Sequence, residues 1–194
     1  VLHPDFWNRR RIRIDGTETV EIPTPSRAWM EGAGVQVVED RRPSLLFDAG
    51  LLVTGEVERT TDFERGMPHQ EAFREGRWVD DSAVYDDQAA VVHVADKGLV
   101  VLTGCGHAGV VNILRHVRRI TGIDRVHAVI GGFHLTGKTF EPIIDPTVDA
   151  IADLQPELIV PAHCTGWKAQ LALAGRLPDA VVPNAVGATF EIGS

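Results

Sequence analysis

The sequence has few cysteines, few aromatic residues and no long apolar run. Its two cysteines, Cys105 and Cys164, are too few for a disulfide framework in 194 residues, which favours a reducing, cytoplasmic setting. No apolar run approaches the roughly 18 residues that a membrane-spanning helix needs. Basic residues are outnumbered as well, 19 against 27 acidic ones, for a net charge of −8. Because no basic stripe is there to displace counterions from phosphates, neither nucleic acid nor an anionic membrane surface is expected as a partner.

The length and composition are those of one globular domain. Hydrophobic residues make up 44% of the chain and charged residues 24%, which is ordinary for a protein with a buried core. We therefore interpret residues 1–194 as a single domain, since the chain is too short to argue for two. The one basic cluster, Arg9-Arg10-Arg11-Arg13, is interpreted as a solvated strand edge.

The amino-terminal half of the chain has the pattern of a sheet. The predicted strands are Arg11–Ile14, Thr19–Ile22, Val35–Glu39 and Ser44–Asp48. A hairpin turn is predicted at Asp15-Gly16, between the first two strands. Leu51–His69 has no regular period and is interpreted as a long surface loop, which is either a lid or binding loop or a disordered segment.

Two further segments precede the second half. Gln70–Arg77 is expected to form one or two helical turns. The acids that follow lack the regular spacing of a calcium loop and are interpreted as a solvated loop rather than a carboxylate metal site; they are Asp80, Asp81, Asp86 and Asp87.

The second half alternates between strand and helix patterns. The predicted strands are Gln88–Ala95, Leu99–Thr103, Arg125–Gly131, Glu157–Val160 and Ala188–Ile192, and the predicted helices are Val110–Ile120, Pro146–Leu154 and Gly166–Ala174. A sheet followed by strand and helix alternation predicts the α/β class.

Three consecutive strands end in turns of small residues that each carry a histidine. The turns are Gly104-Cys105-Gly106-His107, Gly131-Gly132-Phe133-His134 and Pro161-Ala162-His163-Cys164-Thr165-Gly166. If these strands are neighbours, the imidazoles converge at the carboxyl edge of the sheet, where open α/β sheets bind ligands. Because neutral imidazole is a common zinc ligand, we predict His107 and His163 as metal ligands, with His134 as a third ligand or a neighbour.

Two cysteines lie next to the predicted ligands, and five histidines lie outside the three turns. Cys105 and Cys164 adjoin the predicted ligands and are either soft metal ligands, a redox pair or, as we favour, small packing residues. The other five histidines lack the strand-end context and are interpreted as structural or surface residues: His3, His69, His93, His116 and His127.

The first of these turns supports a second interpretation. Gly104-x-Gly106-x-x-Gly109 after a strand and before a helix matches the dinucleotide-binding fingerprint. That motif expects an acidic residue at the end of the following strand, where this chain has Gly131-Gly132-Phe133. The lack of an acidic residue there disfavours dinucleotide binding. The alternative function that stays open is a non-catalytic nucleotide-binding or redox module that uses this turn and the two cysteines.

The combined motifs resemble the metallo-β-lactamase fold, in particular metallohydrolases similar to 7,8-dihydropterin-6-methyl-4-(β-D-ribofuranosyl)aminobenzene 5′-phosphate synthase. The segments that carry the resemblance are Thr54-Gly55-Glu56-Val57, Phe63-Glu64, Asp86-Asp87-Gln88-Ala89, Thr103–Gly109, Gly131–Leu135 and Pro161–Gly166. The resemblance implies a four-layer αββα sandwich with one or two divalent ions at the sheet edge. It also implies that His107 and His163 are metal ligands and that His134 is a catalytic or substrate-side residue.

One signature of that fold is missing. His-x-His-x-Asp-His, which supplies most ligands of the first metal in the family, does not occur in this sequence. We therefore expect the chain to be the carboxyl-terminal portion of an amino-terminally truncated domain, with weak metal binding and little activity alone. For the complete protein the resemblance implies a zinc-type hydrolase in which metal-activated water attacks a phosphoester or related small-molecule substrate. Substrate identity and oligomeric state are not indicated.

Overall fold

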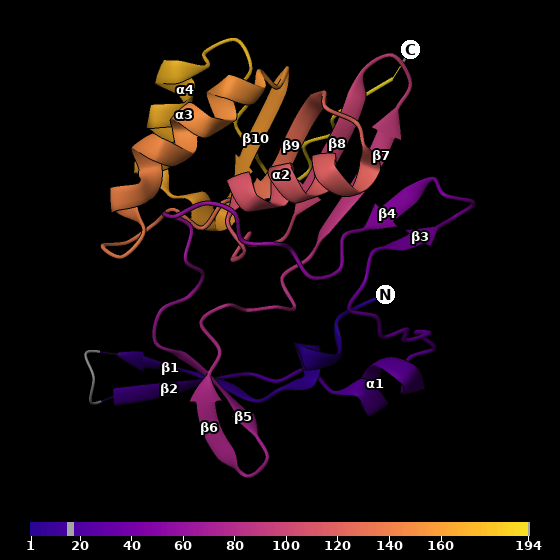
Figure 1. Cartoon of the computed structure of the whole chain (residues 1–194), viewed down its shortest axis with the longest axis vertical. Helices are drawn as coiled ribbons and strands as arrows, with labels where there is room; N and C mark the ends of the chain where they lie inside the picture. The colour runs from indigo at the N-terminus through magenta and orange to yellow at the C-terminus, as the bar shows by residue number, and fades with distance from the viewer. Residues whose placement is uncertain (15–17, 194) are drawn as a thin grey trace.

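The computed structural model describes residues 1–14 and 18–193 and contains two β-sheets (Figure 1). The larger sheet has six strands in the order β10-β9-β8-β7-β4-β3, and the smaller has four in the order β2-β1-β5-β6. The larger sheet comprises β3 (Ser44–Leu46), β4 (Leu51–Val53), β7 (Ala89–Val94), β8 (Gly98–Thr103), β9 (Val126–Gly132) and β10 (Leu158–Ala162). The smaller comprises β1 (Arg10–Ile14), β2 (Glu18–Ile22), β5 (Gln70–Arg74) and β6 (Arg77–Asp80).

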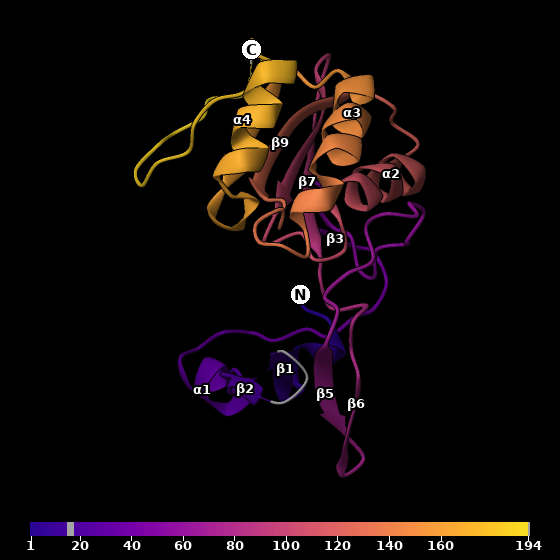
Figure 2. The same cartoon turned by 90° about the vertical axis from the view of Figure 1, so that its left-hand side faces the viewer.

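Three helices cover one face of the larger sheet, as the two views show (Figures 1 and 2). They are α2 (Val110–Thr121), α3 (Ile144–Leu154) and α4 (Trp167–Arg176). The core lies between these helices and the sheet, where Leu99, Val101, Ile113, Ile159 and Leu173 are fully buried. Strands β8, β9 and β10 are parallel, because each is joined to the next by a crossover that contains a helix. The predicted α/β alternation is confirmed.

The smaller sheet is antiparallel and lies beyond one end of the larger one (Figure 2). The predicted first hairpin is confirmed, with Ile12 opposite Val20, while the Asp15-Gly16 turn falls outside the described residues. A short 3-10 helix, η1 (Pro4–Trp7), and helix α1 (Arg27–Gly32) complete the amino-terminal region. Two further 3-10 segments precede helices: η2 (Glu141–Ile143) comes before α3, and η3 (His163–Thr165) comes before α4.

Three secondary-structure predictions were wrong. Residues 70–77 belong to the hairpin β5–β6 and not to a helix, because Glu75 and Gly76 both have positive φ and form a tight turn that pairs Phe73 with Trp78 across the strands. The segment predicted as strand Val35–Glu39 makes a single bridge, from Glu39 to Leu2. Ala188–Ile192 is irregular chain. In both cases a short apolar run lacks a neighbouring strand to pair with.

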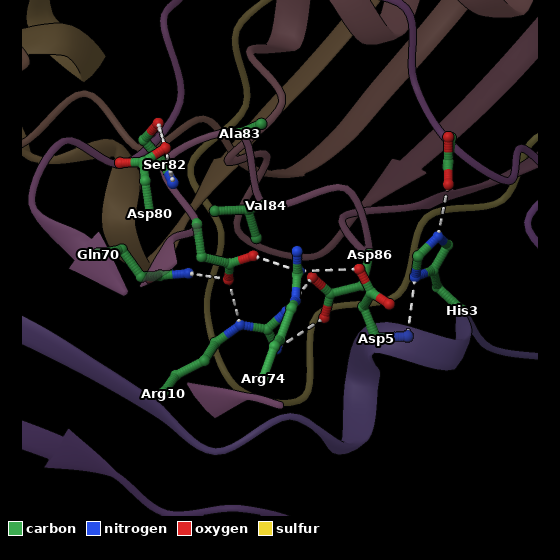
Figure 3. A network of polar contacts seen from close by, with 12 residues as sticks. His3, Asp5, Arg10, Gln70, Arg74, Asp80, Ser82, Ala83, Val84 and Asp86 are labelled. Atoms are coloured by element: carbon green, nitrogen blue, oxygen red, sulfur yellow. Dashed lines mark hydrogen bonds and ion pairs between the residues drawn. The ribbon is translucent and has the colours of Figure 1, made fainter. Parts of the chain in front are cut away.

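Arg10 of the basic cluster and two of the acids, Asp81 and Asp86, form a buried ion network and are not solvated. Arg10 donates to Asp81 at 2.7 Å and to Asp86 at 2.6 Å and 3.0 Å, and the Asp81 side chain is only 1% exposed. Arg74 joins the same network, donating to Asp81 and to Asp5 (Figure 3). The interpretation as a strand edge is wrong because β1 is an interior strand, between β2 and β5. The solvated part of the interpretation holds for Arg9 and Arg13, whose side chains are 54% and 44% exposed. The network ties this sheet to the segment before β7.

Within the described ranges, no helix combines the length and the apolar character that a membrane crossing requires.

Candidate metal centre

The three predicted histidines meet at one edge of the larger sheet. His107 follows β8, His134 follows β9 and His163 follows β10, and these three strands are adjacent and parallel. The rings of His107 and His134 lie 4.7 Å apart between centroids. His163 reaches the same place, since its Nε2 lies 3.1 Å from Sγ of Cys105 in the His107 turn. The convergence that the strand-end pattern indicated is therefore present.

The turn that carries His107 is held by Asp87. The Asp87 carboxylate accepts a hydrogen bond from the backbone N–H of Ala108 at 2.9 Å, and its other oxygen lies 3.9 Å from Nδ1 of His107. The Asp87 side chain is 7% exposed, and burial raises the pKa of its carboxyl group. Its neighbour Asp86 is part of the ion network with Arg10. The prediction of a solvated loop is therefore wrong for Asp87, because the turn that it supports lies 21 residues further along the chain.

The amino end of helix α2 is occupied by Glu64. This buried carboxylate accepts hydrogen bonds from the N–H groups of Val111 at 2.9 Å and Asn112 at 2.8 Å, which are among the free donors of the first helical turn. A Cβ on Gly109 would stand 2.3 Å from the Glu64 carboxylate, so Gly109 is required for this close approach. A dinucleotide pyrophosphate would need the same N–H groups, so the glycine pattern here serves internal packing rather than phosphate binding.

The burial of Glu64 predicts a pH-dependent stability. Burial raises the pKa of Glu64 from 4.5 to about 7. The contribution of Glu64 to the free energy of unfolding is therefore complete at pH values below its unfolded pKa, and it is lost as the pH rises towards 7. We expect the free energy of unfolding to fall by about 3 kcal/mol from this group across that interval. The measurement is urea unfolding from pH 4.5 to 8 of wild type and Glu64→Gln, whose difference isolates Glu64; parallel pH profiles would contradict the prediction.

His134 has the environment of a neutral imidazole. It lies between His107 and Phe140, with the Phe140 ring 4.6 Å away between centroids. Burial, together with the neighbouring His107, lowers its pKa to about 4, and burial also lowers the pKa of His107. His134 adopts a left-handed backbone with φ of 46°, a conformation that costs free energy and is concentrated at functional sites. Its Nδ1 is buried without a hydrogen-bond partner among the described residues.

The two cysteines lie within the same group. A ligand atom from each of Cys105, His134 and Cys164 lies within 4.8 Å of the other two. Burial and the nearby Cys105 raise the pKa of the Cys164 thiol to about 12, so this thiol is a poor nucleophile at neutral pH, which does not favour a redox role. The neutral imidazoles, the orphaned Nδ1 of His134 and this set of nitrogen and sulfur donors fit a zinc-type ion.

Gly132 leaves the space in which these donors sit. A Cβ at this position would stand 2.6 Å from Nε2 of His163, 2.7 Å from Sγ of Cys164 and 2.7 Å from the carbonyl oxygen of Gly104. These separations are far below van der Waals contact, so any side chain at Gly132 would displace the donors.

A pocket of about 470 Å³ opens beside His107 and His134. The residues that line it include Phe63, Phe133, Phe140 and Arg65. Residues 62–66 belong to the segment predicted as a long loop. That segment begins as β4, and it lines the pocket as a binding loop would. It is not simply a surface loop, since Thr54, Val57 and Glu64 within it are buried.

Comparisons with known proteins identify the fold. No family model matches the chain. The 7,8-dihydropterin-6-methyl-4-(β-D-ribofuranosyl)-aminobenzene-5′-phosphate synthase of Methanocaldococcus jannaschii is 35% identical over 147 residues, which are 73% of this chain and 48% of that protein. An uncharacterized protein of the same organism is 30% identical over 148 residues, 75% of this chain and 50% of that protein. The chain thus spans about half the length of the curated relatives that it matches.

A solved structure matches over the whole chain. The crystal structure of a metal-dependent hydrolase of the β-lactamase superfamily superposes with a TM-score of 0.78 and 24% sequence identity, covering 100% of this chain and 70% of that one. The α/β fold expected from the sequence is therefore confirmed by an independent structure. The chain therefore has the fold of that metal-dependent hydrolase of the β-lactamase superfamily, and its sequence is similar to that of the methanogen dihydropterin-aminobenzene-phosphate synthase.

Proposed function

We propose that the protein is a metal-dependent hydrolase of small-molecule phosphoesters or related substrates. The observation that carries the proposal is the convergence of His107, His134 and His163 at the ends of three parallel strands, beside a pocket of about 470 Å³. Ligands of open α/β sheets bind at this carboxyl edge.

His107 and His163 are the residues proposed to hold the metal, with zinc as the favoured ion. Both come from turns next to a packed sheet, and the carboxylate of Asp87 fixes the His107 turn through the N–H of Ala108. Burial keeps the His107 ring neutral, which is the form that coordinates. When bound, a divalent ion would supply Lewis acidity and lower the pKa of a coordinated water toward neutrality.

The pocket is proposed to bind a substrate that joins a planar ring to an anionic group. Its phenylalanine side chains suit a flat apolar ring, and Arg65 suits a negative charge. The name of the methanogen relative describes a dihydropterin aminobenzene phosphate, which combines these two features. We place His134 on the substrate side of the centre, because its ring forms part of the pocket wall between His107 and Phe140.

The two free thiols also fit a cytoplasmic location.

The proposal predicts loss of metal from a His107→Ala/His163→Ala variant. Without both imidazoles we expect the bound metal and the hydrolysis of a chromogenic phosphodiester to fall by at least about tenfold, since even residues outside the coordination sphere change metal affinity by about 10–100-fold. The measurements are elemental analysis of the purified protein and initial rates at fixed zinc. His93→Ala, an exposed histidine on β7, is the matched control. Unchanged metal content in the double variant would remove both residues from the ligand set.

A thermal-shift experiment tests the alternative nucleotide-binding function. A dinucleotide that bound the Gly104–Gly109 turn would raise the melting temperature progressively as its concentration increased above its Kd, by mass action. We expect no shift with NAD, because Glu64 already accepts the hydrogen bonds of the helix amino end. A concentration-dependent shift that Glu64→Gln enhances would favour the alternative.

A further inference from the structure

Two thiols lie among the imidazoles of the candidate metal centre. Ligand atoms of Cys105, His134 and Cys164 are mutually within 4.8 Å, and His163 adds a fourth donor, with its Nε2 at 3.1 Å from Sγ of Cys105. The four side chains come from the ends of β8, β9 and β10. They therefore belong to segments that are distant in sequence but fixed relative to one another by the sheet.

The separations suit a tetrahedral ion. Zinc bonded to thiolate sulfur at about 2.3 Å and to imidazole nitrogen at about 2.0 Å in a tetrahedron places its donor atoms about 3.3–3.8 Å apart. The 3.1 Å contact between Cys105 and His163 is shorter than this range, and the donor atoms of Cys105, His134 and Cys164 lie within 4.8 Å of one another.

The burial of these residues is that of ligands rather than of core packing. Cys105, His134 and Cys164 are all half-buried, and His163 is exposed, so an ion in solution has access to them. Apolar core residues on the same strands, such as Val101 and Ile159, are fully buried. The missing side chain at Gly132 leaves the room that Nε2 of His163 and Sγ of Cys164 occupy.

We propose that Cys105, His134, His163 and Cys164 form a thiolate site for a zinc-class dication. Two thiolates and two imidazoles are a donor set that selects zinc over hard cations such as magnesium. Each coordinating thiol releases its proton to solvent, so one dication is exchanged for two protons. The second nitrogen of His134 remains available to the pocket.

This site differs from the centre of the proposed function in its donors. It uses only residues of this chain, and it does not rest on hydrolytic activity. It shares His163 with the proposed hydrolytic centre, and it uses one nitrogen of His134, whose other nitrogen stays on the substrate side. It also predicts tighter binding than the weak metal binding expected from the sequence, because three donors are close to one another and His163 lies beside Cys105.

Cobalt titration tests the site. The purified chain is stripped of metal with a chelator, kept reduced with a phosphine and titrated with Co²⁺ alone. We expect one equivalent to bind and to give the intense near-ultraviolet charge-transfer absorption of a cobalt–thiolate bond. Cys105→Ser and Cys164→Ser should each remove about half of that absorption and weaken binding at least about tenfold. Absence of the band at saturating Co²⁺, or a wild-type band in both serine variants, would overturn the proposal.

The His107→Ala variant separates this site from the proposed hydrolytic centre. We expect the cobalt–thiolate band to persist in His107→Ala, because His107 is not one of the four donors. If His107→Ala and not the cysteine variants abolishes metal binding, the thiolate site is wrong while the hydrolytic centre stands. If the band survives in His107→Ala but phosphodiesterase activity is unaffected by that variant, the hydrolytic centre is wrong and the thiolate site stands.

A measurement on the unaltered protein guards against misfolded variants. Far-ultraviolet circular dichroism shows whether each serine variant is folded. Cadmium NMR of the wild-type chain loaded with Cd²⁺ then reports the donors directly, since two thiolates shift the resonance far downfield of a site with only nitrogen and oxygen ligands. A resonance in the nitrogen and oxygen range would overturn the proposal without any substitution.

Discussion

An Arg10→Met variant is expected to lose about 3–5 kcal/mol of stability against unfolding. Its guanidinium group makes three hydrogen bonds to two carboxylates, at 2.7 Å to Asp81 and at 2.6 Å and 3.0 Å to Asp86. The side chains of Arg10, Asp81 and Asp86 are 12%, 1% and 10% exposed. Removing the cation leaves buried negative charge with too few partners, because water cannot reach the carboxylates to replace it.

Urea unfolding of the two proteins measures this loss, and Arg13→Met is the matched control. Arg13 lies on the same strand, but its side chain is 44% exposed and its partner Glu71 keeps the bond from Arg11. We expect Arg13→Met to cost less than about 1 kcal/mol, as exposed ion pairs do. Equal losses in the two variants would show that burial of the ion network contributes nothing to stability.

The Arg10 substitution should also weaken the support of the His107 turn in the candidate metal centre. Asp86 precedes Asp87, whose carboxylate holds the turn of His107 through the N–H of Ala108. Loss of the Arg10 bond frees Asp86, so the neighbouring carboxylate is less firmly positioned. The smaller sheet is therefore connected to the candidate site through one pair of adjacent acids.

A Gly132→Ala variant is expected to lose metal affinity by about 10–100-fold and stability by about 1–3 kcal/mol. The added Cβ would stand 2.6 Å from Nε2 of His163 and 2.7 Å from Sγ of Cys164, so both donors must move away. The carbonyl oxygen of Gly104, 2.7 Å from the same Cβ, belongs to the backbone and has little room to yield. Metal titration and urea unfolding measure the two effects separately.

Gly104→Ala provides the comparison in the same site. No described atom lies within 4 Å of a Cβ at Gly104, and the residue has no positive φ. We expect its stability to change by no more than about 0.5 kcal/mol and its metal affinity to stay at the wild-type value. If Gly132→Ala behaved like Gly104→Ala, the donors would not need the space above Gly132.

Local patterns in the sequence were sufficient for the carboxyl-terminal half. The strand and helix periods from Gly98 to Arg176 are strong because each strand is buried on both faces and each helix has one apolar face. The histidines at the strand ends could be placed near one another because consecutive parallel strands, each joined to the next by a helix, are usually neighbours in a sheet. The same reasoning failed for Gln70–Arg77, where a tight turn and its cross-strand partners decided the structure.

What the sequence by itself determined was therefore the α/β class, the resemblance to the metallo-β-lactamase fold and the three histidines at adjacent strand ends. Only the tertiary structure decided which charges are buried and which donors meet. Glu64 binds the amino end of α2 from 47 residues away, Arg10 reaches Asp86 across 76, and Cys105 contacts His163 across 58. Such partners are chosen by sheet order and by the exclusion of water, which act between segments in space, and no local period in the chain records them.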